Sequence, residues 1–249
     1  MDRGLYTAAS GMIAGLSQQE ALIQNLSNMR TVGYKADEVT VKDFPSLLLA
    51  QVRGTKTVSK VGEMGTGVAM ANLTTNFDSG PLRLTDNPLD FAIAGDGFFQ
   101  LQTEDGVRYT RDGRFHLDGD GRLVSADGYP VLGENGDITI PPGDLAVSSS
   151  GAIFVNDEQI GQLSLVKFDD LGVLKKESKN LFSASDGSAQ AMDATEIQVN
   201  QGYLEDSNVD VTKMITEMTS VLRAYQLSQH MVQVQDRING RAASEIGRV

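Results

Sequence analysis

The chain has 249 residues and a formal net charge of −12, from 33 acidic and 21 basic side chains, and it contains no cysteine. That charge repels phosphate backbones and anionic membranes, and no run of Lys or Arg offers a local basic patch, so we expect no nucleic-acid binding. Disulfides, thiolate nucleophiles and Cys-ligated metals are excluded. No apolar run is long enough to span a bilayer, so we expect no direct membrane insertion.

The first 35 residues predict an amphipathic helix that ends in a turn. Asp2 and Arg3 give no net positive charge, and polar residues interrupt the apolar run, so a cleaved export leader is not expected. The apolar residues alternate at spacings of four and three, which is typical of a helix that packs along one seam. This predicted assembly stripe consists of Leu5, Ala9, Met12, Leu16, Ile23 and Leu26.

The helix should end near Asn28, because Thr31 and Gly33 follow in quick succession. Asn25 and Asn28 lie three residues apart and therefore on one helix face. Their amides both donate and accept hydrogen bonds, so they can bind backbone groups where the chain turns away. We expect Asn25, Asn28, Gly33 and Tyr34 to fix the angle at which the chain leaves the helix.

Residues 36–75 predict an extended arm or linker, in which "FPSLLLAQV" is a short helix or strand and "GTKTVSKVGEMGTGV" is flexible. Residues 76–202 predict a β-rich domain of short strands. Asp112-Gly113, Asp120-Gly121 and Asp127-Gly128 are expected hairpin turns. Further strands are expected at residues 138–140, 152–155, 163–168 and 195–199.

Residues 203–249 predict a second amphipathic helix, from Val211 to about Ile238, with Ser207, Asn208 and Asp210 as candidate N-caps. Its assembly stripe is Val211, Ile215, Met218, Leu222, Tyr225 and Val232. Two such helices at opposite ends of a chain can pair, and the pair leaves apolar surface for further partners. The predicted fold class is α+β, with the two terminal helices pairing as a coiled-coil-like element and a mainly antiparallel β domain inserted between them. The alternative is an ordinary helical hairpin packed on its own β domain.

No pattern of catalytic, cofactor-binding or metal-ligating residues emerges, so we expect a protein that is not an enzyme. The stretch "HLDGDGRL" lacks the spacing of a calcium-binding loop, and Asp-Gly is the expected turn dipeptide. His116 and His230 are isolated, which offers neither a metal cluster nor an obvious base. Neighbouring carboxylates on turns do not face each other across a cleft, as a glycosidase requires.

Four collinear segments resemble the bacterial flagellar rod and hook proteins. "LYTAASGM" and "NLSNMRTVGYK" are similar to the N-terminal signature of that family. "GTGVAMANLTTNFDSGPLRLTDNPLDFAIAGDGFFQL" and "YTRDGRFHLDGDGRLVSADGYPVLG" resemble its shared β segments, and "GYLEDSNVDVTKMITEMTSVLRAYQ" resembles its C-terminal signature. The short chain length indicates a rod protein rather than the longer hook protein.

The resemblance implies an axial subunit of the flagellar basal body, exported unfolded by the flagellar type III apparatus. Its terminal helices would form an inner coiled-coil tube with the β domain outside, and the rod would pass torque from motor to hook. The implied partners are copies of itself, other rod subunits, the hook protein and the export apparatus. The alternatives are a hook or hook–rod junction subunit, and an exported glycan-binding or wall-cutting protein.

Overall fold

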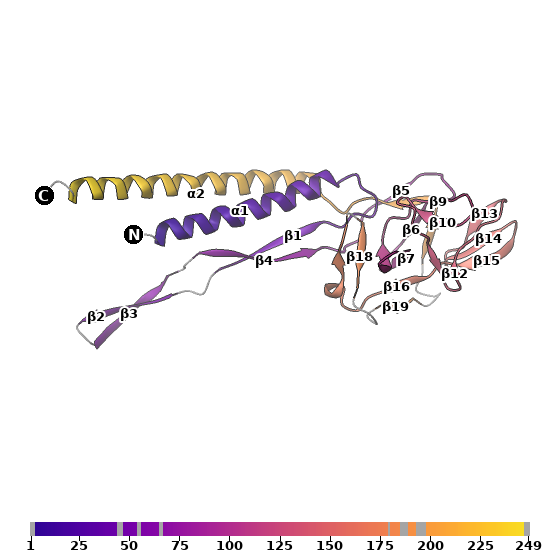
Figure 1. Ribbon diagram of the computed structural model, residues 1–249, viewed down its shortest axis with the longest axis horizontal. Coiled ribbons are helices and arrows are strands. Elements are labelled where there is room, and N and C mark those ends of the chain that lie inside the picture. The colour runs from indigo at the N-terminus through magenta and orange to yellow at the C-terminus, as the bar shows by residue number, and fades with distance from the viewer. Residues whose placement is uncertain are drawn as a thin grey trace. The chain divides into compact units, whose positions relative to one another are not determined.

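The computed structural model describes residues 3–43, 47–53, 56–64, 67–178, 180–184, 189–192 and 198–246. It divides into two compact units (Figure 1). The helical unit comprises Met1–Leu26, Asp37–Thr74 and Asp210–Val249, and the β unit comprises Ser27–Ala36 and Thr75–Val209. Residues 27–35 and 203–209, assigned from sequence to the terminal helical segments, thus group with the β unit. None of the described helices is long and apolar enough to cross a bilayer.

The two helices of the helical unit form where the apolar periodicity predicts them. Helix α1 spans Arg3–Ser27 and helix α2 spans Val211–Ile246. Helix α2 begins at the predicted residue but continues beyond the predicted end at Ile238. The residues that follow include Arg241 and two alanines, which are good helix formers. The glycine that precedes them costs about 1 kcal/mol relative to alanine in a helix, and these helix formers offset that cost.

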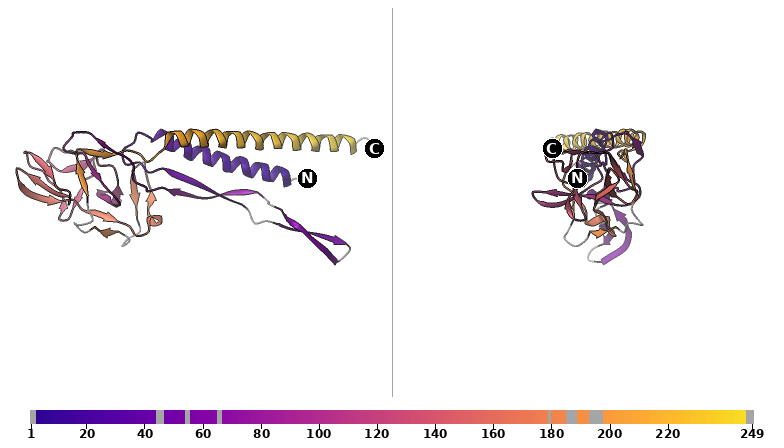
Figure 2. Two further views of the ribbon diagram at one scale, coloured as in Figure 1. Left: turned by 180° about the vertical axis from the view of Figure 1, so that it is seen from behind. Right: turned by 90° about the vertical axis from the view of Figure 1, so that its right-hand side faces the viewer.

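Helices α1 and α2 pack against each other and run antiparallel (Figures 1 and 2). Gly4 lies opposite Gln235, and Gly15 lies opposite Tyr225. A Cβ atom built on Gly15 would lie 3.8 Å from the Tyr225 Cβ, and one on Gly4 would lie 3.3 Å from the Gln235 side-chain oxygen. Small residues on α1 therefore let the two helices approach closely.

Two strand pairs complete the helical unit. Strand β1 (Asp37–Asp43) pairs with β4 (Val68–Thr75), and β2 (Leu47–Arg53) pairs antiparallel with β3 (Lys56–Met64). The prediction of a flexible arm over residues 54–68 was therefore wrong for 56–64, since pairing satisfies backbone groups that an unpaired arm leaves to water. The ambiguous stretch at 44–52 is strand over 47–52, while residues 44–46, 54–55 and 65–66 lie outside the described part.

The β unit is built from short strands, and every strand pair with a described register in it is antiparallel. The strands are β5 (Leu82–Leu84), β6 (Phe91–Ile93), β7 (Phe98–Thr103), β8 (Gly106–Thr110), β9 (Phe115–Leu117), β10 (Leu123–Ser125), β11 (Leu132–Gly133), β12 (Gly136–Asp137), β13 (Leu145–Val147), β14 (Ala152–Val155), β15 (Glu158–Gln162), β16 (Leu165–Lys167), β17 (Lys175–Lys176), β18 (Leu181–Ser183), β19 (Gln190–Ala191), β20 (Val199–Gln201) and β21 (Tyr203–Glu205), with a 3-10 turn at Leu171–Val173. The largest sheet has the order β17-β18-β8-β7-β16-β19.

Two aliphatic and aromatic clusters fill this unit. The larger one packs Phe91, Phe99 and Leu123 with aliphatic residues from strands as distant as β20, and the smaller one gathers around Phe98 and Phe182. These side chains are at most 2% exposed. The sheets therefore share their apolar faces, which is how short strands gain stability that none has alone.

The expected turns and strands of the β region are confirmed in part. Asp120-Gly121 and Asp127-Gly128 lie in turns, with Gly121 and Gly128 at positive φ. Asp112-Gly113 was wrongly predicted as a hairpin turn: β8 pairs with β7 and β18, whereas β9 pairs with β10, so residues 111–114 connect different sheets. Strands form at 152–155 and 165–167, residues 138–140 contain only a bridge at Thr139, and 193–197 lie outside the described residues.

Helix α2 should depend on Asp210 for its start. The Asp210 carboxylate accepts the N–H groups of Thr212 (2.9 Å) and Lys213 (3.1 Å), which otherwise lack helical partners. Replacing Asp210 with Ala should cost about 1 kcal/mol, whereas Asp210→Asn should cost only a fraction of that. Hydrogen exchange of amides 211–213 in both variants measures the difference, and equal exchange rates would contradict the capping role.

Candidate functional site

A buried stretch, here called the exit segment (Val32–Ala36), follows helix α1 inside the β unit. Gly33 has a φ of +67°, and a Cβ atom there would lie 2.5 Å from the Arg111 carbonyl carbon. Its N–H donates to the Glu205 carbonyl oxygen (2.8 Å). Glycine is therefore required by both the backbone angle and the close approach of another chain segment.

Two side chains that are distant in sequence hold the same segment. The Lys176 ammonium donates to the Lys35 carbonyl oxygen (2.8 Å) and lies 3.9 Å from the centre of the fully buried Tyr34 ring. The Asn180 amide donates to the Val32 carbonyl oxygen (3.0 Å). The cation over the ring and the hydrogen bonds to two backbone carbonyls hold Tyr34 in place.

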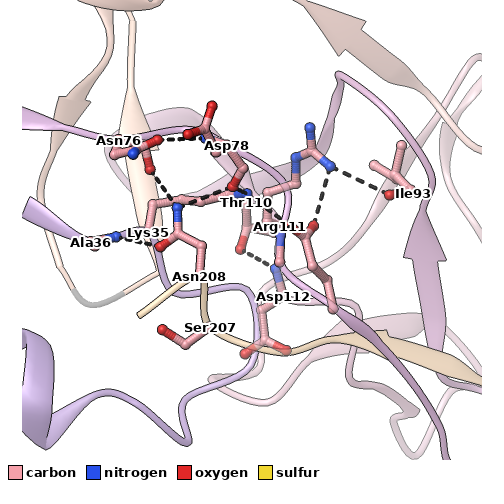
Figure 3. A network of polar contacts seen from close by, with 12 residues as sticks. Lys35, Ala36, Asn76, Asp78, Ile93, Thr110, Arg111, Asp112, Ser207 and Asn208 are labelled. Atoms are coloured by element: carbon pink, nitrogen blue, oxygen red, sulfur yellow. Dashed lines mark hydrogen bonds and ion pairs between the residues drawn. The ribbon is translucent and has the colours of Figure 1, made fainter. Parts of the chain in front are cut away.

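Three charged side chains meet beneath the exit segment, here called the buried ion triad (Lys35, Arg111 and Glu205). The Lys35 ammonium lies 2.8 Å from one Glu205 carboxylate oxygen, and an Arg111 guanidinium nitrogen lies 3.2 Å from the other. All three side chains are at most 2% exposed. Glu205 also accepts the Gly80 N–H (2.8 Å), and Arg111 donates to the Ile93 carbonyl oxygen at 3.4 Å (Figure 3).

Burial is the dominant electrostatic influence on the two cations. It lowers the pKa of Lys35 and the pKa of Arg111, and in both cases the attraction of the Glu205 carboxylate opposes that shift. The Arg111 guanidinium gains further from the Phe98 ring, whose centre is 5.1 Å away. A buried pair of this kind is a weak source of net stability, but removing one member leaves an uncompensated charge. The triad therefore fixes geometry more than it adds stability.

Asn208 bridges two chain segments beside the triad (Figure 3). Its side-chain oxygen accepts the Ala36 N–H (2.8 Å), and its amide donates to the carbonyl oxygens of Asn76 (2.9 Å) and Asp78 (3.0 Å). Ser207 is buried, and its hydroxyl accepts the N–H two residues along the chain. Neither residue caps α2; both hold the segment that precedes it.

In the helical unit, Asn25 joins the end of α1 to the start of β1. Its amide donates to the Asp37 carbonyl oxygen (2.7 Å), and its oxygen accepts the Asp37 N–H (2.9 Å). The amide also lies 4.0 Å from the Met214 sulfur of α2. In the β unit, Asn28 is buried and its side-chain oxygen accepts the Thr31 hydroxyl (3.1 Å). The two asparagines thus bind different parts of the chain.

The predicted assembly stripes are only partly covered. Residues Leu5, Met12 and Leu26 of α1 and Met218, Tyr225 and Val232 of α2 are half-buried, whereas Ala9, Leu16, Ile23, Val211, Ile215 and Leu222 are exposed. Leu16 and Ile23 are 45% and 43% exposed, and Ile215 is 54% exposed. Large exposed apolar side chains in a row are typical of an interaction surface.

The residues of α1 that contact α2 each precede a residue of the predicted stripe by one position. Gly4, Gly11 and Gly15 face α2, so the stripe that begins at Leu5 lies on the adjacent side of the helix. The sequence pattern places Met231 and Ile238 beside the α2 stripe, where they are exposed, and it missed the exposed apolar residues Tyr6, Ile13 and Leu227. The stripe thus remains a candidate for contacts with other chains.

The turn carboxylates have structural partners. Asp118 accepts the N–H groups of Asp120 (2.9 Å) and Arg122 (2.8 Å), and these bonds, that from Arg122 above all, lower the pKa of the Asp118 carboxyl. Across the described ranges, no three His, Asp or Glu side chains are grouped so that they could hold a metal ion. The geometry of this loop is that of a hairpin turn.

The buried ion triad was not anticipated from the sequence, although a signal was present. Lys35 ends "VGYK", Arg111 lies in "YTRDG" and Glu205 lies in "GYLEDSN", so each charge sits within a segment that carries the family resemblance. The three segments thus offered candidates, but nothing local in them shows that the charges meet.

Removing the central charge of the triad should destabilise the β unit strongly. Glu205→Gln leaves two buried cations without a counterion, and we expect a loss of about 3–5 kcal/mol in the free energy of unfolding. The control is Asp206→Asn, which breaks a pair with Arg83 whose side chain is 52% exposed, and should cost at most about 1 kcal/mol. Urea unfolding of the full chain compares the two, and similar losses would contradict the account.

Gly33→Ala should be more damaging than a glycine substitution that only strains the backbone. Gly95 also has a positive φ, of +96°, but no atom lies within 4 Å of a Cβ built there. Gly95→Ala should therefore cost about 1–3 kcal/mol through backbone strain alone. Gly33→Ala adds a clash with the Arg111 backbone and should cost clearly more by the same unfolding assay, and the reverse order would argue against the close approach.

Three family models match this chain, each over one of the segments that supply the ion triad. The models are "Flagella basal body rod protein" at residues 5–35, "Flagellar hook protein FlgE/F/G D1 domain" at 92–155, and "Flagellar basal body rod FlgEFG protein C-terminal" at 200–245. Together they include Lys35, Arg111 and Glu205.

Full-length relatives agree with these matches. The chain is 33% identical to the flagellar hook-basal body complex protein FlhO of Bacillus subtilis and 33% identical to the flagellar basal-body rod protein FlgF of Caulobacter vibrioides, in both cases over 100% of each chain. It is 34% identical to the rod protein FlgG of Bacillus subtilis, over 96% of this chain and 97% of that one. The chain therefore belongs to the family of flagellar hook and basal-body rod proteins.

Proposed function

We propose that this chain is a structural subunit of the bacterial flagellar basal-body rod, and that it polymerises through its terminal helices. The names of its full-length relatives support the rod assignment and a place in the flagellar basal body. They do not favour the hook, junction, glycan-binding or wall-cutting alternatives. The observation that carries polymerisation is the row of exposed apolar side chains on both helices, exemplified by Leu16, Ile23, Ile215 and Leu222.

The energetic argument concerns how little the helical unit buries. Among the described side chains of α2, Met214 alone is buried, and the buried residues of α1 include the small Ala14 and Ala21. Ordering a backbone residue costs about 1–2 kcal/mol. Apolar contacts with neighbouring copies supply what the isolated pair lacks, and the helices of adjacent subunits then form a coiled-coil tube around the rod axis. In this proposal the rod transmits torque from the motor to the hook.

The partners in this proposal are copies of the chain, other rod subunits, the hook protein and the flagellar type III export apparatus. Export requires the chain to be unfolded in transit and to order its helices on arrival. Weak burial in the helical unit supports such a sequence of events, because the helices gain most of their stability in the polymer. The inner tube would be helical and the β unit would lie outside it.

Polar substitutions on the exposed stripe should abolish assembly and spare the monomer. The double variant Leu16→Gln, Ile23→Gln keeps helix propensity and removes exposed apolar surface, so the free energy of unfolding should change by less than about 1 kcal/mol. Sedimentation of the polymer and swimming of a strain that carries the variant should both be lost. The control is Glu20→Gln, an exposed position on the same helix, which should assemble and swim normally.

A double variant that forms polymers and swims as the unchanged protein does would overturn the assembly role of the stripe.

A second measurement addresses folding on assembly. Amide hydrogen exchange on the dilute monomer should show weak protection over residues 3–26 and 211–246 and strong protection in the β unit. Strong protection of both helices in a verified monomer would mean a self-contained helical hairpin and would remove that step from the proposal.

A further inference from the structure

The helical unit contains a groove of about 280 Å³ between α1, α2 and β1. Its apolar lining comes from Leu22 of α1, Val39 of β1, and Met214 and Val221 of α2. The carboxylates of Glu38 and Glu217 line it as well, together with Lys213, which pairs with Glu217. An apolar lining that also carries carboxylates suits a long apolar side chain next to a cationic one.

The distal half of α2 presents the complementary chemistry. Leu227, Met231 and Ile238 lie on one face of the helix and are 67%, 61% and 52% exposed. Arg237 and Arg241 are exposed on the same half, and no carboxylate whose side chain is described lies within 4.0 Å of either guanidinium. This half of the helix thus offers apolar side chains followed by cations.

The groove cannot be filled by the distal half of the same molecule. Helix α2 is continuous from Val211 to Ile246, so the twenty residues between Val221 and Arg241 span roughly 30 Å along a rigid rod. The side chains that match the groove therefore reach it only from another molecule. The existing pair between Lys213 and Glu217 is long, at 3.9 Å, and both side chains are exposed, so a guanidinium can replace it at little cost.

We propose that the distal half of α2 of one copy docks in this groove of the next copy. Met231 and Ile238 cover the apolar lining, and Arg241 pairs with Glu38 and Glu217. The two surfaces are unlike, so the contact is heterologous and propagates as an open chain of subunits rather than closing as a symmetric dimer. The inference rests on the proposed rod function and specifies which surfaces of successive copies meet.

Cysteine cross-linking tests this contact without background, because the chain has no cysteine of its own. One copy carries Ser220→Cys, which lines the groove, and another carries Ser244→Cys on the exposed distal half of α2. Under conditions in which the chain sediments as a polymer, oxidation of the mixture should give a disulfide-linked heterodimer. The control pairs Ser244→Cys with Ser228→Cys, because Ser228 faces Gly11 of its own α1, and should give none.

Charge reversal provides the second arm. Glu217→Arg on the groove copy, or Arg241→Glu on the distal copy, should each lower the heterodimer yield about tenfold, as expected for a close interfacial ion pair. The two reversals combined should restore the yield. Far-UV circular dichroism verifies that each variant keeps its helix content, so that a loss of yield reports on the contact.

The outcomes separate this inference from the proposed function. Polymers that form without the 220–244 cross-link, or that link Ser220→Cys copies to each other instead, would overturn the head-to-tail contact and leave the rod assignment intact. Charge reversals that do not change the yield, or that the double reversal does not rescue, would overturn the ion pair and the orientation it sets. A chain that never polymerises and does not restore swimming would overturn the proposed function and this contact together.

Discussion

The Glu205 carboxylate is the interaction on which the β unit depends. One of its oxygens holds Lys35 and the N–H of Gly80, and the other holds Arg111. The backbone carbonyl of the same residue accepts the N–H of Gly33. A single residue of β21 thus holds the exit segment, the segment after β4 and the segment after β8 that carries Arg111. Because a buried ion adds little net stability, its value here lies in excluding other arrangements of these three segments.

The helical unit differs from the β unit in how its elements pack together. Its internal seam is lined by glycines on α1, and several of its larger apolar side chains are exposed. Close approach of two helices through small residues gains dispersion contacts but buries little area per residue. The helical unit therefore buries little apolar area of its own, and in the proposed function contacts with other copies supply the rest. The β unit, which has two well-packed clusters, does not share that dependence.

The sequence predicted the helices well because their signal is local. Periodic apolar residues located Arg3–Ser27 and the start of α2 at Val211. The same pattern could not locate the seam between the helices, because Gly4, Gly11 and Gly15 carry no hydrophobic signal of their own. Hydrophobic periodicity identifies residues that avoid water, and it does not say whether the neighbour that covers them belongs to the same chain.

Other features escaped prediction because they depend on residues far apart. The Asp112-Gly113 dipeptide has turn chemistry, but Gly113 lies against the Phe91 backbone and connects two sheets. The ion triad joins residues 170 positions apart, and no local pattern encodes such a pairing. The segment around Lys56–Met64 was expected to be flexible on composition alone, and its pairing with β2 became visible only in three dimensions.

The sequence separation within the triad also governs when the fold can close. Lys35 and its partner Glu205 lie near opposite ends of the inserted region. Asn208, which accepts the Ala36 N–H, lies even further along the chain. A chain that emerges N-terminus first from any narrow conduit therefore has a bare cation at position 35, with no counterion to hold it, until nearly all of the β unit has followed. Closure of such a long loop is slow compared with local helix formation. In the proposed export, the β unit could therefore not complete its fold until β21 had followed, when the passage was almost over.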